Sequence, residues 1–522
     1  MRIAFLSSLD PENIRNWSGT LYYMYHQLQK KHQVTWVGGD LMAYARKKQQ
    51  EKSGYSLYRI LIGHSAFFGK ILSHFFLRES YDLILCRDDF FLADLVTDIP
   101  VIYIGDTTYR LFRSYDPKPY HTWDRISDDL ERRSIQKADR LVYSSEWAAN
   151  SAVTHYGADP EKVIVLEFGA NLSVPEPFPL GKTIRDRQCH LLFIGREWER
   201  KRGQFALEVY QALKKLSDCT VSLSLVGCTP PFEIEDDGVM VYPDLDKRKV
   251  QDCVFLDSLF RKSHFLIAPT CFECYGIVNC EAAAYGLPVM TSDVGGIPQI
   301  IHSGENGYLF SLSDTPDIYA QVIHGLLQNI AEYEQMSGNA LESYRTRLNW
   351  ERWGKVMDGI MEQLVDSCKH LILSTYVAYV QEKKEVKKRL SAQFNGRKEF
   401  NCIWMAVKDM KNIDLWNCLV KAVKDAMEKE EEVISFCLES HSFTVYYTYP
   451  MFLRNVLNAH QKHTDLLLGG KSRPVQFFVI FASLFEKILL YDFQEADSLE
   501  TVLLELSQQT LVFYPDLSNE FV

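Results

Sequence analysis

The sequence has no hydrophobic run long enough to cross a membrane. Its longest apolar stretch, VQFFVIFASLF at residues 475–485, is far shorter than the roughly 20 residues that a membrane-spanning helix needs. The apolar run at residues 3–6 is too short for the core of a signal peptide and is soon followed by Asp10 and Glu12. We therefore expect a soluble protein of the cytoplasm, and we leave open a peripheral contact with the inner face of the membrane.

The sequence also lacks an excess of positive charge and a cysteine framework. Its 57 lysines and arginines are outnumbered by 68 aspartates and glutamates, which gives a net charge of −11. This acidic total argues against a general nucleic-acid-binding protein. The 12 cysteines are dispersed along the chain, as is typical of buried thiols in a reducing compartment.

Patterns that bind a metal are equally scarce. The CxxC match from Cys271 to Cys274 is not followed by a second one, and the next histidine is His302. Asp88 and Asp89, in RDDF, come nearest to a DxD-like pair, and we interpret them as the cap of a helix that follows a loop. The sequence therefore predicts no metal site.

What the sequence does contain is a regular alternation of strand-like and helix-like segments over its first two thirds. Short apolar runs, such as RIAFL at residues 2–6 and DLILC at 82–86, are separated by amphipathic segments such as residues 18–32. This alternation predicts a doubly wound α/β domain with a parallel sheet. Three prolines and a glycine at residues 173–188 predict a linker. The alternation then resumes, so we expect two such domains in tandem.

From about residue 350 the strand signal fades. Residues 349–368 are predicted to form a helix, residues 374–394 a mixed-charge helix, and residues 498–511 another helix, while SFTVYYTYPMF at 442–452 is compatible with a short strand. We therefore expect the last part of the chain to be a mainly helical extension.

Two carboxylates stand out in APTCFECYGIVNCEAAAYGLPV, residues 268–289. Glu273 and Glu281 are eight positions apart, in a segment that reads as a strand end, a loop and a helix start. Glu281 lies within an apolar helix, where a carboxylate needs a partner, and the paired hydroxyls of a sugar or ribose would suit it. The alternative is that one is a loop acid and the other a helix-start acid favoured by the helix dipole.

The predicted helix begins just past Gly276. Ligands of an open α/β sheet bind beyond the carboxyl ends of its strands. The amides of Gly276, Ile277 and Val278 would point outward at the positive end of the helix, which is a place for a phosphate. Gly276 itself lets the backbone approach a ligand closely.

A second strand–loop–helix segment, FIGREWERKRGQFALEV at residues 193–209, carries a dense run of charge. Arg196 directly follows the strand glycine Gly195, and Lys201 comes five positions later. Two cations at the carboxyl edge of a strand suit a diphosphate. A solvated charged loop is the alternative, but it becomes less attractive because the same sheet edge hosts the two glutamates.

Two glycine-containing segments add weaker signals. Gly19 opens the first helix of the first domain, which Ser18 is placed to cap. GGIP at residues 295–298 precedes another helix and is either a phosphate nest or an ordinary tight turn.

Together these segments resemble the retaining glycosyltransferases of family 4, which have the GT-B fold. The resemblance covers roughly residues 1–365. It rests above all on the paired glutamates with the following YGLPV, and on GREWERKRG, which resembles the donor-phosphate loop of the family. Residues 138–172, GENGYLF at 304–310 and the helix that starts near Trp350 also fit the family.

The resemblance implies a GT-B architecture: two Rossmann-like doubly wound domains that face a cleft. An N-terminal domain on the acceptor side covers residues 1–172 and is rejoined by a crossover helix at about residues 350–370. A C-terminal domain on the donor side covers residues 186–349. The helical extension, residues 371–522, lies outside the resemblance.

The resemblance also implies roles for individual residues on the donor side. Arg196 and Lys201 would bind the donor diphosphate and stabilise the charge of the leaving group. Glu273 would contact hydroxyls of the transferred sugar on the reacting face, and Glu281 would hold the ribose hydroxyls. Arg202 departs from the family pattern, which leaves open whether it exchanges roles with Lys201.

The remaining implied contacts are shared between the two domains. Backbone amides from Gly276 to Val278, next to the strand end at Gly195, would support sugar and phosphate. Gly19 would approach the phosphates from the first domain. Asp106, at the end of the strand VIYIG, is expected to contact the sugar or acceptor, and its alternative is a helix or turn cap.

The implied function is retaining transfer of a sugar from a UDP- or GDP-sugar to a glycan, lipid-linked or protein acceptor, as in polysaccharide biosynthesis. The expected mechanism is front-face attack without a metal or cofactor, because arginine and lysine supply the positive charge. The alternatives are a GT-B nucleotide-sugar epimerase or phosphorylase, and a non-catalytic scaffold that works through its helical extension. Homo-oligomerisation through the extension is left open, and no nucleic-acid partner is expected.

Overall fold

The computed structural model describes residues 1–522 except 52–54, 80, 98, 117, 175–180, 368–371, 398, 445–446, 448, 472–473, 514–516 and 521–522. The chain divides into two compact units. The first comprises residues 1–74, 80–95 and 101–361, and the second comprises residues 75–79, 96–100 and 362–522. Part of the predicted linker, residues 175–180, lies outside the described residues.

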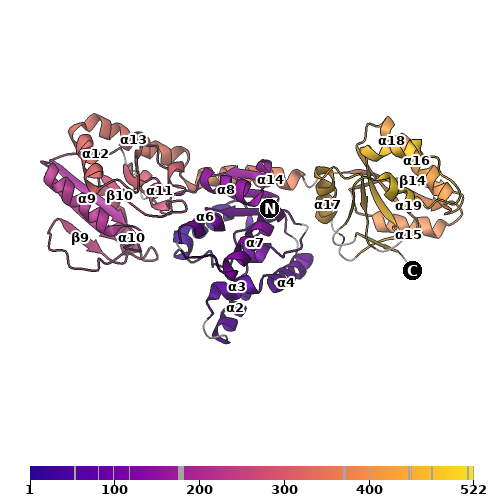
Figure 1. Ribbon diagram of the computed structural model, residues 1–522, viewed down its shortest axis with the longest axis horizontal. Coiled ribbons are helices and arrows are strands. Elements are labelled where there is room, and N and C mark those ends of the chain that lie inside the picture. Colours follow the sequence, from indigo (N-terminus) through magenta and orange to yellow (C-terminus); the bar gives the residue numbers. More distant parts are fainter. Residues whose placement is uncertain are drawn as a thin grey trace. The chain divides into compact units, whose positions relative to one another are not determined.

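The first unit begins with an N-terminal lobe built on a parallel sheet (indigo to purple in Figure 1). The strand order is β2-β1-β3-β4-β5-β6, and each neighbouring pair is parallel. The strands are β1 (Arg2–Leu6), β2 (Gln33–Val37), β3 (Leu83–Cys86), β4 (Val101–Gly105), β5 (Arg140–Tyr143) and β6 (Val163–Val165). The helices are α1 (Thr20–Gln29), α2 (Gly39–Glu51), α3 (Leu57–Gly63), α4 (Ser65–Arg78), α5 (Asp89–Leu92), α6 (Tyr109–Ser114), α7 (Thr122–Lys137) and α8 (Glu146–Tyr156).

A second lobe repeats this architecture. Its strand order is β12-β11-β10-β7-β8-β9, again with parallel pairing. The strands are β7 (Gln188–Ile194), β8 (Thr220–Val226), β9 (Val239–Tyr242), β10 (Phe265–Ala268), β11 (Val289–Ser292) and β12 (Gly307–Phe310). The helices are α9 (Gly203–Leu216), α10 (Val250–Lys262), α11 (Ile277–Ala283), α12 (Pro316–Gln328) and α13 (Ile330–Thr346).

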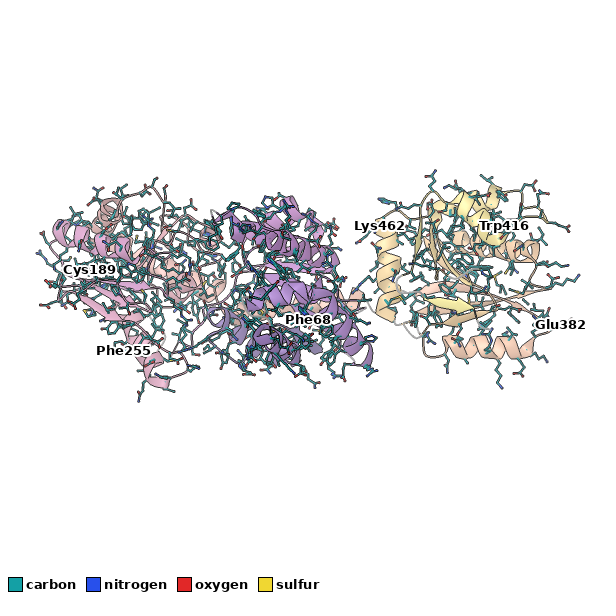
Figure 2. The ribbon with its side chains drawn as sticks, turned by 60° about the horizontal axis from the view of Figure 1, so that its bottom comes forward. Phe68, Cys189, Phe255, Glu382, Trp416 and Lys462 are labelled. Atoms are coloured by element: carbon teal, nitrogen blue, oxygen red, sulfur yellow. The ribbon has the colours of Figure 1, made fainter. Side chains whose placement is uncertain are left out.

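The central strands of both lobes are buried along most of their length. β3 and β11 are buried at every position, and β1 and β4 at all but one. Continuous burial is typical of parallel strands covered by crossover helices. Phe68 and Cys189 are fully buried in the interiors of the two lobes and are labelled in Figure 2. The expectation of two Rossmann-like α/β domains is confirmed.

Helix α14 (Trp350–Ser367) follows the second lobe but packs on the first. Asp358 on α14 accepts hydrogen bonds from Lys31 Nζ at 2.6 Å and His32 Nε2 at 2.9 Å. Tyr23 of α1 stacks on Trp350 with ring centroids 6.5 Å apart. In Figure 1, α14 accordingly lies among the purple elements.

The two stretches of chain that connect the lobes touch each other. The backbone N–H of Ala170 donates to the carbonyl oxygen of Leu348 at 3.0 Å. A Cβ on Gly169 would overlap the backbone of Trp350. Only glycine fits at this position, because the two chain segments approach each other so closely that no side chain has room.

The start of α1 differs from the prediction. The residue at its N-cap is Gly19, in the left-handed region at φ 95°, and no side chain caps the helix. Ser18 lies before it with φ 56°. The prediction that Ser18 caps this helix was therefore wrong, because the tight turn that precedes α1 places a glycine at the cap.

The second unit contains a third domain with a mixed sheet. Its order is β14-β13-β15-β18-β17-β19, and β16 and β20 form a separate pair. The strands are β13 (Leu373–Val380), β14 (Phe400–Val407), β15 (Val433–Cys437), β16 (His441–Phe443), β17 (Leu466–Leu468), β18 (Phe477–Phe481), β19 (Thr510–Val512) and β20 (Ser518–Glu520). The helices are α15 (Lys384–Phe394), α16 (Asn412–Glu428), α17 (Tyr449–Gln461), α18 (Ala482–Leu490) and α19 (Leu499–Leu506).

This sheet corrects the expectation of a mainly helical extension. The segment interpreted as one helix, residues 374–394, is the strand β13 followed by the helix α15. β13 is buried at seven of its eight positions, so it has no polar–apolar alternation that would mark it as a strand. A short apolar run of this kind cannot be distinguished from a buried helix by its period.

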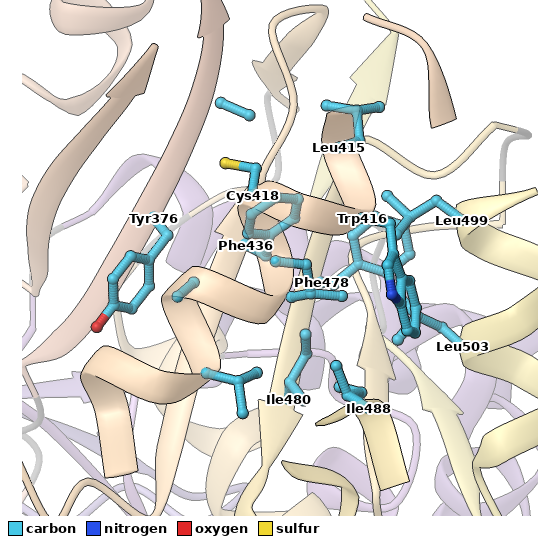
Figure 3. Close-up of a cluster of buried hydrophobic side chains, with 14 of the residues drawn as sticks. Tyr376, Leu415, Trp416, Cys418, Phe436, Phe478, Ile480, Ile488, Leu499 and Leu503 are labelled. Carbon is cyan, nitrogen blue, oxygen red and sulfur yellow. The ribbon is translucent and has the colours of Figure 1, made fainter. Parts of the chain in front are cut away.

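One face of the third sheet packs against α16, α18 and α19 through a large apolar cluster (Figure 3). Trp416 of α16 is 3% exposed and stacks on Phe493 with ring centroids 4.7 Å apart. Ile480, Leu499 and Leu503 belong to the same cluster. The domain thus has an apolar core of its own.

We expect Trp416→Ala to lower the free energy of unfolding of the third domain by about 3–5 kcal/mol, as truncation of a buried tryptophan does. Calorimetric unfolding of the full chain measures this loss as a lower melting transition. Trp404→Ala on β14 is the matched control, because Trp404 is only partly buried. Equal effects of the two substitutions would contradict the assignment of Trp416 to the core.

Candidate active site

The connectivity of the second lobe creates one position where ligands are expected. After β7 the chain continues to β8 and β9 on one side, and it then returns to β10 on the other side of β7. The carboxyl ends of β7 and β10 therefore flank a topological switch point, where open α/β sheets bind ligands. The charged loop 195–203 follows β7, and the loop 269–276 follows β10.

These two loops are joined by direct contacts. Lys201 Nζ forms an ion pair and hydrogen bond with Glu273 Oε2, and both side chains are less than one fifth exposed. Arg200 Nη1 lies 3.6 Å from the same Glu273 oxygen and donates to the carbonyl oxygen of Phe272 at 2.9 Å. The backbone N–H of Cys271 donates to Arg200 O at 2.9 Å. The structure thus brings the two predicted clusters together.

Gly195 makes room for Lys201. A Cβ on Gly195 would lie 2.9 Å from Cβ and Cγ of Lys201, so the lysine stem runs against the strand end only because no side chain is present there. Arg202, in the left-handed region at φ 55°, instead places its guanidinium 3.9 Å from the ring centroid of Phe205. Of the two neighbouring cations, Lys201 is therefore the one that contacts Glu273.

Arg196 differs from Arg200 and Lys201 in having no ion-pair or hydrogen-bond partner among the described residues. Its side chain is exposed, and no ion pair or hydrogen bond joins its guanidinium to any residue that the structure describes. Lys201 and Arg200 are engaged with Glu273. Arg196 is therefore an exposed cation of this loop whose charge remains available to an anionic ligand.

Glu281 lies on α11, behind the left-handed N-cap Gly276 at φ 91°. Ile277 and Val278 are the first two residues of this helix. The Glu281 carboxylate is only 4% exposed, and Lys247 Nζ donates to its Oε1 at 2.6 Å. The buried charge thus has the partner that its position requires.

Sequence reasoning missed Lys247. The lysine lies in the loop between β9 and α10, well removed from Glu281 in sequence. Its loop follows the same pattern of a strand end, charged residues and a helix start that singled out residues 193–209. The pattern could have marked this loop as a candidate, but it does not reveal that Lys247 contacts Glu281.

Asn279 is a second residue that sequence reasoning missed. It is 1% exposed, and neither atom of its side-chain amide has a hydrogen-bond partner among the described residues. A Cβ on Gly276 would lie 2.7 Å from Asn279 Nδ2. Gly276 is thus required both by its φ angle and by the amide packed against it.

The N-terminal lobe has its own switch point, between β1 and β3. Arg87 directly follows β3, and its guanidinium lies 4.7 Å from the ring centroid of Trp17, in the turn before α1. Trp17 Nε1 donates to Asp106 Oδ2 at 3.0 Å. The N-cap of the following helix α6 is Thr108, so Asp106 does not occupy that cap.

Asp106 and Glu273 are close enough to interact although they belong to different lobes. Desolvation raises the pKa of Asp106, the positive charge of Arg87 opposes the rise, and the negative charge of Glu273 adds to it. The charges of the predicted site residues Asp106 and Glu273 therefore influence each other, and Arg87 is a nearby cation that sequence reasoning missed.

Further contacts connect the two lobes. Arg15 Nη2 pairs with Asp246 Oδ2 at 2.8 Å, and Tyr275 donates its hydroxyl to Phe168 O at 3.2 Å. Phe272 packs against Tyr115 with ring centroids 4.1 Å apart.

The GGIP turn packs directly on the Glu273 loop. A Cβ on Gly295, which has φ +57°, would overlap the carbonyl oxygen of Glu273, and one on Gly296 would overlap that of Cys274. The backbone N–H of Gly296 donates to Cys274 O at 3.1 Å. Close backbone packing therefore accounts for both glycines.

We expect Gly295→Ala to lower the free energy of unfolding by about 3 kcal/mol, from strain at positive φ together with overpacking. Gly304→Ala is the matched control, because Gly304 also has positive φ (+83°) but a Cβ there meets nothing within 4 Å. Denaturant unfolding of both variants gives the comparison. Equal losses would show that the contact with Glu273 contributes nothing.

No helix in the described part of the chain is both long and apolar enough to cross a membrane.

Comparison with known proteins assigns the two lobes to a family. Residues 20–174 match the family described as Glycosyltransferase Family 4, and residues 188–329 match the family described as Glycosyl transferases group 1.

Curated relatives include the D-inositol 3-phosphate glycosyltransferases of Paenarthrobacter aurescens and Corynebacterium kroppenstedtii. The first is 27% identical over 241 residues, which is 44% of this chain and 58% of that protein. The second is 28% identical over 263 residues, which is 46% of this chain and 57% of that protein. The chain thus spans a little over half the length of these relatives.

Among solved structures, a sucrose-phosphate synthase from Thermosynechococcus elongatus is similar with a TM-score of 0.52 and 16% identity, over 70% of this chain and 99% of that one. This likeness shows the two-lobed fold. The two family matches lead to the conclusion that residues 20–174 form a glycosyltransferase family 4 domain and residues 188–329 a glycosyl transferases group 1 domain.

Proposed function

We propose that this chain is a retaining glycosyltransferase that moves a sugar from a nucleoside-diphosphate sugar to an acceptor hydroxyl. The observation that carries the proposal is the group of charged side chains at the switch point of the second lobe. There Lys201 and Glu273 are paired, and Arg196 is exposed and has no ion-pair or hydrogen-bond partner among the described residues.

The proposed chemistry is governed by charge. Cleavage of the bond between the anomeric carbon and the phosphate oxygen leaves negative charge on the diphosphate and positive charge on the carbon. Fixed cations at the leaving group stabilise the first of these, and we assign this role to Arg196 and Lys201. Because Lys201 is held by Glu273 in the structure, a bound diphosphate would have to share or replace that contact.

The acceptor oxygen would bond to the anomeric carbon on the face that the diphosphate leaves. The acceptor proton would pass to the departing diphosphate oxygen, so no carboxylate pair need act as in a glycosidase. Glu273 would contact hydroxyls of the transferred sugar, and Asp106 would contact the sugar or acceptor from the N-terminal lobe. Glu281 would hold the ribose, while Gly276, Ile277 and Val278 would offer backbone amides beside it.

The donor is proposed to be a UDP- or GDP-sugar, and the acceptor a glycan, lipid-linked sugar or protein. The relatives are named for D-inositol 3-phosphate, and this compound therefore belongs among the acceptors to be tested.

A thermal-shift panel of UDP-, GDP- and ADP-sugars tests the donor, because a ligand that binds the folded state raises the melting temperature. We expect one nucleotide class to raise it and turnover to release the nucleoside diphosphate once an acceptor is present. The proposal fails if no nucleotide sugar binds. It also fails if the bound sugar is epimerised without an acceptor, or if cleavage requires free phosphate.

A further inference from the structure

Lys247 joins the two lobes at the candidate nucleotide site. Its Nζ donates to Glu281 Oε1 at 2.6 Å and to the backbone carbonyl oxygen of Asn171 at 2.9 Å. Glu281 belongs to the second lobe, and Asn171 follows the last strand of the N-terminal lobe. A single ammonium group is thus shared between a buried carboxylate of one lobe and the backbone of the other.

Asn171 in turn holds the turn that contains Gly19. Its Nδ2 donates to Ser18 O and to Thr20 Oγ1, both at 3.0 Å, and its Oδ1 accepts from Trp350 Nε1 at 3.1 Å. The residue is fully buried. Its side chain is therefore committed to the N-terminal lobe, and its carbonyl oxygen is the group that Lys247 reaches.

The loop that carries Lys247 has a second attachment to the same turn. Asp246 accepts from Arg15 Nη2 at 2.8 Å and from Arg248 Nη2 at 2.6 Å. Arg15 directly precedes the 3-10 turn Asn16–Gly19. The loop thus contacts the segment before α1 through Asp246 and, through Lys247, the asparagine that fixes it.

We infer that Lys247 is a positioning residue that couples nucleotide binding at Glu281 to the placement of the N-terminal lobe. The inference rests on the proposed function, in which Glu281 accepts hydrogen bonds from the ribose. Lys247 engages Oε1, and no described residue donates to Oε2, which leaves the two lone pairs of that oxygen for the two ribose hydroxyls. Because the same ammonium holds Asn171, the carboxylate is oriented correctly only when the two lobes are together.

The test compares the affinities of Lys247 variants for the nucleoside diphosphate of the sugar that the wild-type protein binds. Lys247→Met is expected to weaken binding by between about 5-fold and about 150-fold, the usual range for coupling between sites. Turnover at saturating donor should change much less, because Lys247 touches no reacting atom. Lys247→Arg keeps the charge and should recover part of the affinity. Lys249→Met is the matched control, because Lys249 is exposed in the same loop.

Arg15→Met separates coupling between lobes from a local effect on Glu281. It removes an attachment of the loop without touching Glu281 or Lys247, and it should also weaken nucleotide binding. Small-angle X-ray scattering measures the radius of gyration with and without the nucleotide. The nucleotide should reduce this radius more in the wild-type protein than in Lys247→Met or Arg15→Met. If Lys247→Met does not fold, Lys247→Arg and Arg15→Met still test the inference.

Binding as tight in Lys247→Met as in the wild-type protein would overturn the inference. Weakened binding in Lys247→Met with unchanged binding in Arg15→Met would overturn the coupling between lobes. A wild-type protein that binds no nucleotide would instead count against the proposed function, so the two failures can be told apart.

Discussion

Replacement of Arg196 by alanine is expected to reduce kcat/KM by about 10²–10³-fold, the loss that follows removal of one group that stabilises developing negative charge. Arg196 lies at the carboxyl end of β7, is exposed and has no partner among the described residues. Its charge is therefore available to the departing diphosphate, and its loss removes no ion pair or hydrogen bond with any residue that the structure describes.

The measurement pairs steady-state kinetics with thermal unfolding. The melting temperature of Arg196→Ala should equal that of the wild-type protein. Arg345→Ala is a matched control, because Arg345 is an exposed arginine on α13 of the same lobe. Full activity in Arg196→Ala would reject the assignment of the diphosphate site.

The second large effect is expected for Glu281→Ala. Hydrogen bonds to a charged group contribute about 1.5–3 kcal/mol each, so two ribose hydroxyls on the carboxylate correspond to about 10²–10⁴-fold in nucleotide affinity. Lys247 is left without its carboxylate partner, but it keeps the Asn171 carbonyl and its side chain is one quarter exposed. We therefore expect the variant to fold.

Deoxyribose analogues provide the decisive comparison. The wild-type protein should bind the ribonucleoside diphosphate much more tightly than its 2′,3′-dideoxy form, and Glu281→Ala should bind the two equally. Glu281→Gln keeps the shape of the side chain and should retain part of the discrimination. Persistent discrimination in Glu281→Ala would place the ribose elsewhere.

The core of the candidate site could be predicted from the sequence because of the geometry of parallel sheets. Lys201 and Glu273 are far apart in sequence, yet each follows a strand, and β7 and β10 are neighbours. Strand ends of a parallel sheet meet at one edge, so both side chains were expected there. Arg196 and Gly276 were placed by the same reasoning.

Contacts made by loops that are distant in sequence from the predicted site residues could not be predicted from the sequence. Lys247 reaches Glu281, and Arg87 reaches the Trp17–Asp106 pair, from loops whose sequences read as ordinary charged turns. Their partners are set by the tertiary arrangement of loops and lobes, which no local pattern encodes.

The third domain shows a different limit. Its longest strands, β13 and β14, are apolar runs next to charged helices, and the helical pattern of α15 obscured the strand before it. β13 is buried at seven of its eight positions, and burial on both faces removes the alternation by which a strand is usually detected.

The two chain segments that connect the lobes contact each other at Gly169 and Trp350, and this contact limits how the lobes can move. Both chain segments that connect the lobes pass one point, where the backbone N–H of Ala170 donates a hydrogen bond to the carbonyl oxygen of Leu348. Sliding of one lobe along the other would break this hydrogen bond. Rotation of one lobe about that point would leave the hydrogen bond intact. A side chain at position 169 would force these two segments apart and would so shift the point about which one lobe can rotate relative to the other.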